Sequence, residues 1–202
     1  DLFLRQPTEA VDAFVDALRT LSPEIRVKSL NLFEAKLPAF DRIAAEGKYA
    51  IMLGTPASPE AKAAFGMAVR LIDQFKAADG YLFAIPMWNF GIPYVLKQYL
   101  DLLVQPTYTF AVGPDGYQGL VTRKKAVVVY ARGGDYSDPA AAAGDFQKPY
   151  MDLILGFIGV TDVHSVVVQP TLAAGAETAQ AKLTAAINEL RALARTIQAN
   201  DT

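Results

Sequence analysis

Tyr81-Leu-Phe-Ala-Ile-Pro-Met-Trp-Asn-Phe-Gly-Ile-Pro93 is the stretch that decides the fold of this chain. Its apolar run breaks at Pro86, a short loop follows, and helical periodicity begins at Ile92 and continues to Leu103. This succession is typical of a strand, a loop and a helix. Open α/β sheets bind their ligands in loops of this kind, outside the carboxyl ends of the strands.

The loop itself carries Met87, Trp88, Asn89 and Phe90. A thioether, two aromatic rings and an amide in one short loop suit a planar heteroaromatic ring. The alternative is that the three apolar side chains only close the loop against the core. The spacing of the residues does not separate the two interpretations.

Strand-like and helix-like segments alternate along the chain, which predicts an α/β fold with a mostly parallel sheet and helices on both faces. Gly113–Gly119 is rich in turn formers and predicts a surface hairpin or a surface excursion of the chain. Without repeats or linkers, residues 1–202 are expected to form a single domain. We expect strands at 25–30, 81–85, 125–131 and 163–168, and helices at 8–21, 40–53, 59–79, 92–103, 146–159 and 177–199.

The composition excludes several classes of function. Hydrophobic residues make up 52% of the chain and charged residues 20%, which indicates a globular protein. A net charge of −2 and the absence of basic clusters argue against nucleic acid as a partner. The chain has no cysteine, so disulfides and thiolate chemistry are excluded. No apolar run is long enough for a membrane helix and the N-terminus does not resemble a signal peptide, so we expect a cytoplasmic protein.

A second candidate site follows the apolar strand at 125–131, where the chain continues as Arg132-Gly133-Gly134. Two glycines let the backbone approach a ligand closely and direct N–H groups toward it. The same pair could instead serve only as a tight connection. Because both loops follow strands that consecutive βα units place side by side, we expect them to form one crevice.

Four motifs together resemble the FMN-dependent NADH-azoreductase family, which is related to the NAD(P)H:quinone oxidoreductases. The similarity runs in order along nearly the whole chain from Thr8. The resemblance implies a flavodoxin-like, doubly wound parallel sheet in the order 2-1-3-4-5. The motifs are Pro86-Met-Trp-Asn-Phe90, Gly119-Leu-Val-Thr-Arg-Lys-Lys125, Arg132-Gly-Gly134 and Leu155-Gly-Phe-Ile-Gly-Val-Thr-Asp162.

The resemblance also implies the roles of particular residues. Phe110 and Val112 correspond to the region that lines the substrate side in relatives, often across a dimer interface. Phe157 matches an aromatic residue that faces the substrate, although packing of its helix explains it equally well. Ala131 replaces the serine of the family, which removes a hydroxyl contact. By position, the flavin contacts would be Met87, Trp88, Asn89, Phe90, Ala131, Arg132, Gly133 and Gly134.

The N-terminus departs from the family pattern. Relatives begin with a full apolar strand and a serine-rich loop that holds the FMN phosphate at the start of the first helix. Here only Leu2-Phe-Leu4 could form such a strand, and Arg5-Gln6-Pro7 leads directly into the helix. Arg5, Gln6 and Thr8 offer a partial replacement for the phosphate loop. We expect that this segment is incompletely represented in the sequence, because a sheet of this order needs its first strand.

The resemblance implies an FMN-dependent oxidoreductase that takes two electrons from NADH or NADPH and passes them to an azo compound or a quinone. One site serving two planar substrates in turn implies ping-pong order. The chemistry would be borne by the flavin, so no catalytic side chain and no metal site are expected. The only histidine, His164, is expected to be structural.

Two alternatives remain at this point. The Ala131 replacement and the missing phosphate loop would fit a relative with weakened FMN binding that acts as a binding or biosynthetic module. An electron-transfer flavodoxin is a weaker option, because such proteins are typically strongly acidic and this chain is not. A homodimer is expected from the resemblance, and also because aromatic loops beside the crevice would leave apolar surface exposed on a monomer.

Overall fold

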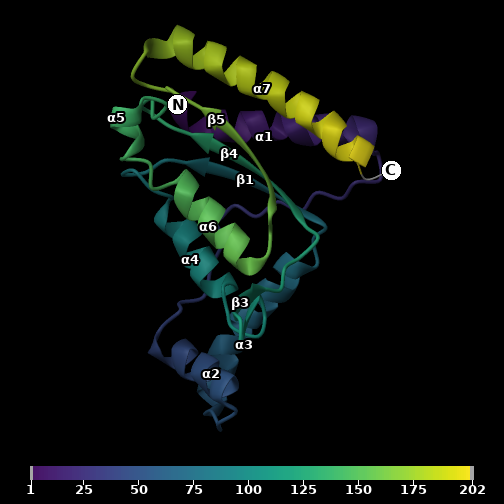
Figure 1. Ribbon diagram of the computed structural model, residues 1–202, viewed down its shortest axis with the longest axis vertical. Helices are drawn as coiled ribbons and strands as arrows, with labels where there is room; N and C mark the ends of the chain where they lie inside the picture. The colour runs from purple at the N-terminus through teal and green to yellow at the C-terminus, as the bar shows by residue number, and fades with distance from the viewer. Residues whose placement is uncertain (1, 201–202) are drawn as a thin grey trace.

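The structure is a computed structural model of the chain, and it describes residues 2–200. Its centre is a parallel sheet of three strands, β1 (Gly80–Pro86), β4 (Lys125–Ala131) and β5 (Asp162–Val168), in the order β1-β4-β5 (Figure 1). The strands are in register, with Pro86 beside Ala131 and Ala131 beside Val168. Their carboxyl ends therefore lie at the same edge of the sheet.

The position of β4 in the middle of the sheet explains why its residues 126–131 are all apolar. Ala126, Val128 and Tyr130 pack into one core cluster, whereas Val127 and Val129 pack into another on the opposite face. Successive side chains of a strand point to opposite faces, so a strand covered on both sides needs apolar residues at every position. The buried central strand predicted at residues 125–131 is confirmed.

Helices cover both faces of the sheet, as predicted (Figure 1). On one face lie α1 (Leu2–Leu21) and α7 (Gly175–Asn200), which pack against each other. On the other face lie α4 (Tyr94–Leu103) and α6 (Lys148–Ile158), the two helices that flank the candidate site. A short helix, α5 (Pro139–Ala142), precedes α6. None of the helices within residues 2–200 has both the length and the hydropathy needed to cross a membrane.

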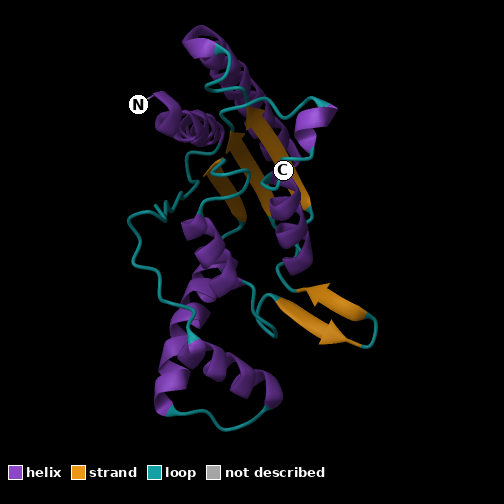
Figure 2. Cartoon of the chain, turned by 90° about the vertical axis from the view of Figure 1, so that its left-hand side faces the viewer, coloured by secondary structure: helices purple, strands orange, loops and turns teal. Residues whose placement is uncertain are grey.

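The helices α2 (Arg42–Leu53) and α3 (Pro59–Lys76) form a hairpin that extends away from the sheet (Figures 1 and 2). Ser58 caps α3 by accepting a hydrogen bond from the N–H of Ala61, at the helix start that the sequence predicts. The far end of α3 reaches the core beside the sheet through Ile72.

The predicted surface hairpin is also present, as β2 (Phe110–Gly113) and β3 (Gly116–Gly119). It lies away from the main sheet, near the C-terminal end of α6 (Figures 1 and 2). Gly119 touches the backbone of Gly159, and a Cβ at Gly119 would come within 2.3 Å of the Gly159 nitrogen. This close backbone contact fixes the hairpin to the end of the helix.

Two expectations near the N-terminus are wrong. Residues 25–30 form no strand despite their alternating pattern, and Val27 and Leu30 are exposed. A strand needs a neighbour to bond its backbone, and no strand in the described part of the chain pairs with this segment. The first helix begins at Leu2 and not at Thr8, so Leu2-Phe-Leu4 is helical and Pro7 lies inside the helix.

Candidate functional site

The loops that follow β1 and β4 lie side by side at the carboxyl edge of the sheet. The N–H of Met87 donates to the carbonyl oxygen of Ala131 at 2.8 Å, which continues the strand pairing into both loops. One step further, the N–H of Arg132 donates to Val168 at 3.0 Å. The aromatic loop and the diglycine turn therefore share one edge, where open α/β sheets bind ligands.

The loop after β1 is a tight two-residue turn. Trp88 and Gly91 exchange both backbone hydrogen bonds at 3.0 Å, and Asn89 and Phe90 between them have φ angles of 48° and 72°. Positive φ at both central residues is typical of a type I′ turn, which usually contains glycine. For a phenylalanine this conformation costs roughly 1 kcal/mol or more, so the surrounding structure holds the turn in a strained form.

The aromatic side chains of this turn are not buried in the core. Trp88 is 39% exposed and Phe90 is 56% exposed, whereas Met87 is half-buried. The Trp88 ring packs against two neighbours, Phe33 at a centroid distance of 5.3 Å and Tyr94 at 6.5 Å. The two rings thus lie largely at the surface and not inside the core.

The diglycine turn is packed against the connection between β5 and α7. The carbonyl oxygen of Gly133 accepts hydrogen bonds from the N–H groups of Leu172 at 3.1 Å and Ala173 at 3.0 Å. A Cβ at Gly133 would lie 3.0 Å from Leu172 Cδ1, so a glycine permits the close approach. The connection between β5 and α7 therefore holds the turn through the carbonyl oxygen of Gly133.

The two turns leave peptide donors without protein acceptors. Within residues 2–200, the N–H groups of Asn89, Phe90, Gly133 and Gly134 donate to no protein atom. The exposed aromatic rings can stack on a flat ligand ring. The four backbone N–H groups can donate hydrogen bonds to carbonyl groups on the edge of that ring. The same donors can stabilise negative charge that develops on such a ring.

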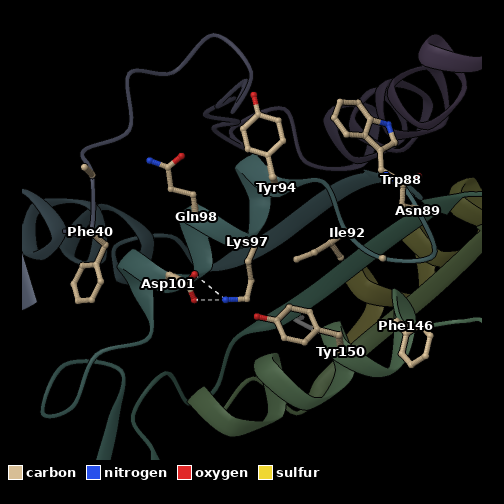
Figure 3. Close-up of a pocket in the computed structure, with 12 residues that line it drawn as sticks. Phe40, Trp88, Asn89, Ile92, Tyr94, Lys97, Gln98, Asp101, Phe146 and Tyr150 are labelled. Carbon is tan, nitrogen blue, oxygen red and sulfur yellow. Dashed lines mark hydrogen bonds and ion pairs between the residues drawn. The ribbon is translucent and has the colours of Figure 1, made fainter. Parts of the chain in front are cut away.

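A groove of about 830 Å³ begins at the aromatic turn and runs along α4 (Figure 3). Lys97 and Asp101 form an ion pair in it at 2.6 Å, and the hydrogen bond that Lys97 donates to Asp101 raises the pKa of Lys97 above its usual value. The rest of the lining is mostly aromatic or apolar. The lining residues are Ala39, Phe40, Trp88, Asn89, Gly91, Ile92, Tyr94, Lys97, Gln98, Asp101, Phe146 and Tyr150.

Comparison with known proteins shows the family of this chain. A family model described as the flavodoxin-like fold matches residues 5–194. The chain belongs to this flavodoxin-like family. It is 49% identical over 184 residues to the FMN-dependent NADH:quinone oxidoreductase of Nitratidesulfovibrio vulgaris (strain DP4), an alignment that covers 91% of this chain and 88% of that protein.

Solved structures of the flavodoxin-like fold are similar as well. The azoreductase from Bacillus anthracis str. Sterne superposes with a TM-score of 0.87 at 29% identity, covering 95% of this chain and 91% of that one. An FMN-dependent NADH-azoreductase from Bacillus anthracis str. Ames Ancestor, in complex with FMN, gives a TM-score of 0.85 at 23% identity, with coverage of 95% and 91%. The second likeness concerns the fold alone.

The structure does not bring all predicted site residues of the flavodoxin-like chain together. Phe110 and Phe157 pack against each other with centroids 4.7 Å apart, and Tyr117 joins them. This cluster and the exposed Val112 lie at the C-terminal end of α6, whereas the N-terminal end of α6 adjoins the aromatic turn. An 11-residue helix is roughly 16 Å long, so the cluster is separated from the turns of its own chain.

Arg132 and Ala131 occupy the predicted edge but face the protein. The Arg132 guanidinium is buried and bonded to Asp145, Gln147 and Gln169. Sequence reasoning missed these three partners, and only Asp145, an acidic residue just before a helical segment, carries a recognisable capping signal. The Ala131 side chain is also buried, and its carbonyl oxygen accepts from Met87.

The residues predicted to replace the phosphate loop differ in their burial. Gln6 is fully buried in α1, and neither atom of its amide has a hydrogen-bond partner in the described chain. Thr8 is exposed, and the side chain of Arg5 lies outside the described residues. His164 contacts Asp162 at 3.0 Å along β5.

Proposed function

We propose that this chain is an FMN-dependent oxidoreductase that transfers two electrons from NADH to quinones and azo compounds. The observation that carries the proposal is the pair of adjacent turns at the carboxyl edge of a flavodoxin-like sheet, where open α/β sheets bind ligands. These turns carry exposed aromatic rings and peptide N–H groups that donate to no atom within residues 2–200. The similarity to a quinone oxidoreductase and to an azoreductase supports the same reaction. We also propose NADPH as a second donor and the cytoplasm as the location of the enzyme.

The residues present fit FMN. We propose that Met87, Trp88 and Phe90 contact its ring system, while the N–H groups of Asn89, Phe90, Gly133 and Gly134 bond the ring carbonyls. FMN, when bound, supplies the hydride chemistry. The chain orients the ring, excludes water from one side of it and stabilises negative charge at the diglycine turn. Arg132 contributes through the turn it supports, because its N–H and its guanidinium are both engaged within the protein.

The second part of the proposal is a homodimer that completes the site. Phe157 lies at the C-terminal end of α6, and Phe110 and Val112 lie on β2 beside it, so these residues are too far from the two turns to line the site of their own chain. Val112 is nevertheless 68% exposed. We propose that these residues line the acceptor side of the site in a second copy. Light scattering should then give twice the monomer mass. Phe157→Ala should raise the KM for a quinone while leaving the dissociation constant of FMN nearly unchanged, and a monomeric, fully active protein would exclude the arrangement.

We also propose the sheet order 2-1-3-4-5, for one domain. The three observed strands β1, β4 and β5 stand in consecutive positions, as strands 3, 4 and 5 do in that order. In that order, strands 1 and 2 would lie beyond the free edge of β1. The alternative of a binding module without turnover is not favoured, because the similar proteins bear the names of redox enzymes.

One experiment tests the central claim through the only tryptophan of the chain, Trp88. Addition of FMN to the purified protein should quench Trp88 fluorescence, and the complex should oxidise NADH with menadione or methyl red as acceptor. Gly134→Ala should weaken FMN binding about tenfold, because it adds a methyl group, 3.6 Å from Tyr136 Cε2, at the turn whose N–H groups we propose to bond the ring. Gly156→Ala is the matched control, since a Cβ there meets no atom within 4 Å.

The proposed function fails if FMN neither quenches Trp88 nor supports NADH oxidation in the wild-type protein. Quenching without turnover, even with menadione in excess, would instead favour a flavin-binding protein that is not an enzyme. If Gly134→Ala and Gly156→Ala lose the same amount of FMN affinity, the diglycine turn is not part of the site.

A further inference from the structure

Each nitrogen of the Arg132 guanidinium donates a hydrogen bond to a protein side chain. Nη2 donates to Asp145 Oδ2 at 2.8 Å, Nε to Gln147 Oε1 at 3.1 Å and Nη1 to Gln169 Oε1 at 3.3 Å. The Arg132 side chain is 4% exposed and that of Asp145 is 14% exposed. We call Arg132, Asp145, Gln147 and Gln169 the Arg132 network.

The network joins the ends of the three strands. Arg132 directly follows β4, and Gln169 directly follows β5. Gln147 reaches β1, because its Nε2 donates to the carbonyl oxygen of Ile85 at 3.1 Å. Ile85 is the last residue before Pro86, where the aromatic turn departs from the strand. The network therefore holds the points from which both turns leave the sheet.

A second connection reaches the tip of the aromatic turn. Asp145 Oδ1 accepts from the N–H groups of Gln147 at 3.0 Å and Lys148 at 3.1 Å, so it binds the backbone where α6 begins. The residue between Asp145 and Gln147 is Phe146, whose N–H donates to the carbonyl oxygen of Phe90 at 3.0 Å. The position of Asp145 thus fixes the bond that holds the strained turn.

We propose that the Arg132 network positions the two ring-binding turns relative to each other, with Arg132 as a positioning residue that does not touch the ligand. A buried ion pair often contributes little net stability compared with apolar residues of the same shape, so stability alone does not explain it. A planar guanidinium can bond three acceptors in fixed directions, which a lysine ammonium at the same place cannot do. This role of the Arg132 network rests on the proposed function, because it assumes that the two turns bind FMN.

The test uses Trp88 in the ligand-free protein, so it does not depend on FMN. Asp145→Asn removes the charge that faces Arg132, and Gln147→Met removes the bond to Ile85 while keeping a similar volume. Both variants should make Trp88 more accessible to acrylamide and shift its emission, with the circular dichroism of the helices unchanged. Asp152→Asn is the matched control, because it breaks the exposed ion pair with Lys148 on the same helix.

Ligand binding supplies the second measurement. In both network variants the dissociation constant of FMN should rise about tenfold, while the KM for the quinone at saturating FMN changes little. Arg132→Lys should fail to restore wild-type affinity, because the forked geometry is needed as well as the charge. If Arg132→Lys binds FMN as the wild type does, only charge matters and positioning is refuted.

The failure of this inference is distinguishable from failure of the proposed function. If the wild type does not bind FMN, the proposed function is lost, but the accessibility of Trp88 still tests the network. If Trp88 accessibility in folded Asp145→Asn and Gln147→Met equals that of the wild type and of Asp152→Asn, the network does not position the turn. A change of the same size in Asp152→Asn would refute it equally.

Discussion

The ring of Phe33 lies against the ring of Trp88, with centroids 5.3 Å apart and planes inclined by 46°. The segment that carries Phe33 is held at both sides, by Leu32 and Leu37 in the core beside the sheet and by a hydrogen bond of 3.1 Å from Gln98 Nε2 to the carbonyl oxygen of Pro38. One flank of Trp88 is therefore covered by the chain itself.

Phe33→Ala should uncover that flank. We expect the Trp88 emission to shift to longer wavelength, while the free energy of unfolding falls by only about 1 kcal/mol, because Phe33 is itself 53% exposed. Fluorescence and urea unfolding of the ligand-free protein measure the two effects. Tyr49→Ala, at an equally exposed aromatic residue on α2, should leave the emission unchanged, and a shift there would show that the probe does not report on Phe33.

The strained turn allows a comparison of two substitutions at Phe90. Phe90→Ala and Phe90→Gly remove nearly the same side chain, but only glycine adopts a φ of 72° without penalty. Phe90→Gly should therefore be more stable than Phe90→Ala by roughly 1 kcal/mol in urea unfolding, although both should bind FMN more weakly than the wild type. Equal stability of the two variants would mean that the turn is not strained.

Gly47 of α2 packs directly against the backbone of α3. A Cβ at this position would lie 2.3 Å from the carbonyl oxygen of Ala61 and 2.8 Å from Phe65 Cβ, so the helices would have to separate. Gly47→Ala should lower the free energy of unfolding by about 1–3 kcal/mol, as measured by urea titration.

The control for Gly47 is Gly66, which lies on α3. A Cβ there meets only the flexible end of Arg70 at 3.9 Å. Gly66→Ala should stabilise the protein by roughly 0.5–1 kcal/mol, because alanine is the better helix former. Stabilisation by both substitutions would show that the contact at Gly47 is not tight.

Stability at alkaline pH should depend on Tyr99. Burial raises the pKa of Tyr99 to about 12, above the value of about 10 of an unfolded tyrosine. The unfolded chain then loses its proton first, so the stabilisation is complete below pH 10 or so and is lost as the pH rises through the folded pKa.

Urea unfolding at rising pH measures this effect. The wild type should lose more stability than Tyr99→Phe between the two pKa values, by up to about 2–3 kcal/mol. Parallel losses in the two proteins would assign the alkaline transition to other groups, and Tyr81, whose pKa is also raised by burial, is the next candidate.

The parts of the fold that could be predicted from the sequence are those fixed by local pattern. The apolar run of β4, the Ser58–Pro59 start of α3 and the turn formers of the β2–β3 hairpin each specify an element without outside help. Residues 25–30 show the limit of this reasoning, because their alternation describes a strand whose formation depends on a neighbour. A pattern states what a segment can form, and the partner decides whether it does.

The site was predictable in part for a similar reason. Parallel order alone places the loops after β1 and β4 at one edge, and the structure puts Met87 in contact with Ala131 there. The commitment of Arg132 to Asp145 and Gln169 arises from tertiary packing, which no spacing along the chain reveals. The position of Phe157 at the far end of α6 likewise follows from helix length and direction.

The place of β4 between two separate cores has a consequence for how the molecule opens. Its backbone is paired on both edges and its side chains are covered on both faces, so deuterium should enter its amides only when the whole protein unfolds. The slowest-exchanging peptides would then lead directly into the turn at Gly133, so the segment that we propose to contact FMN is attached to the part of the molecule that opens last.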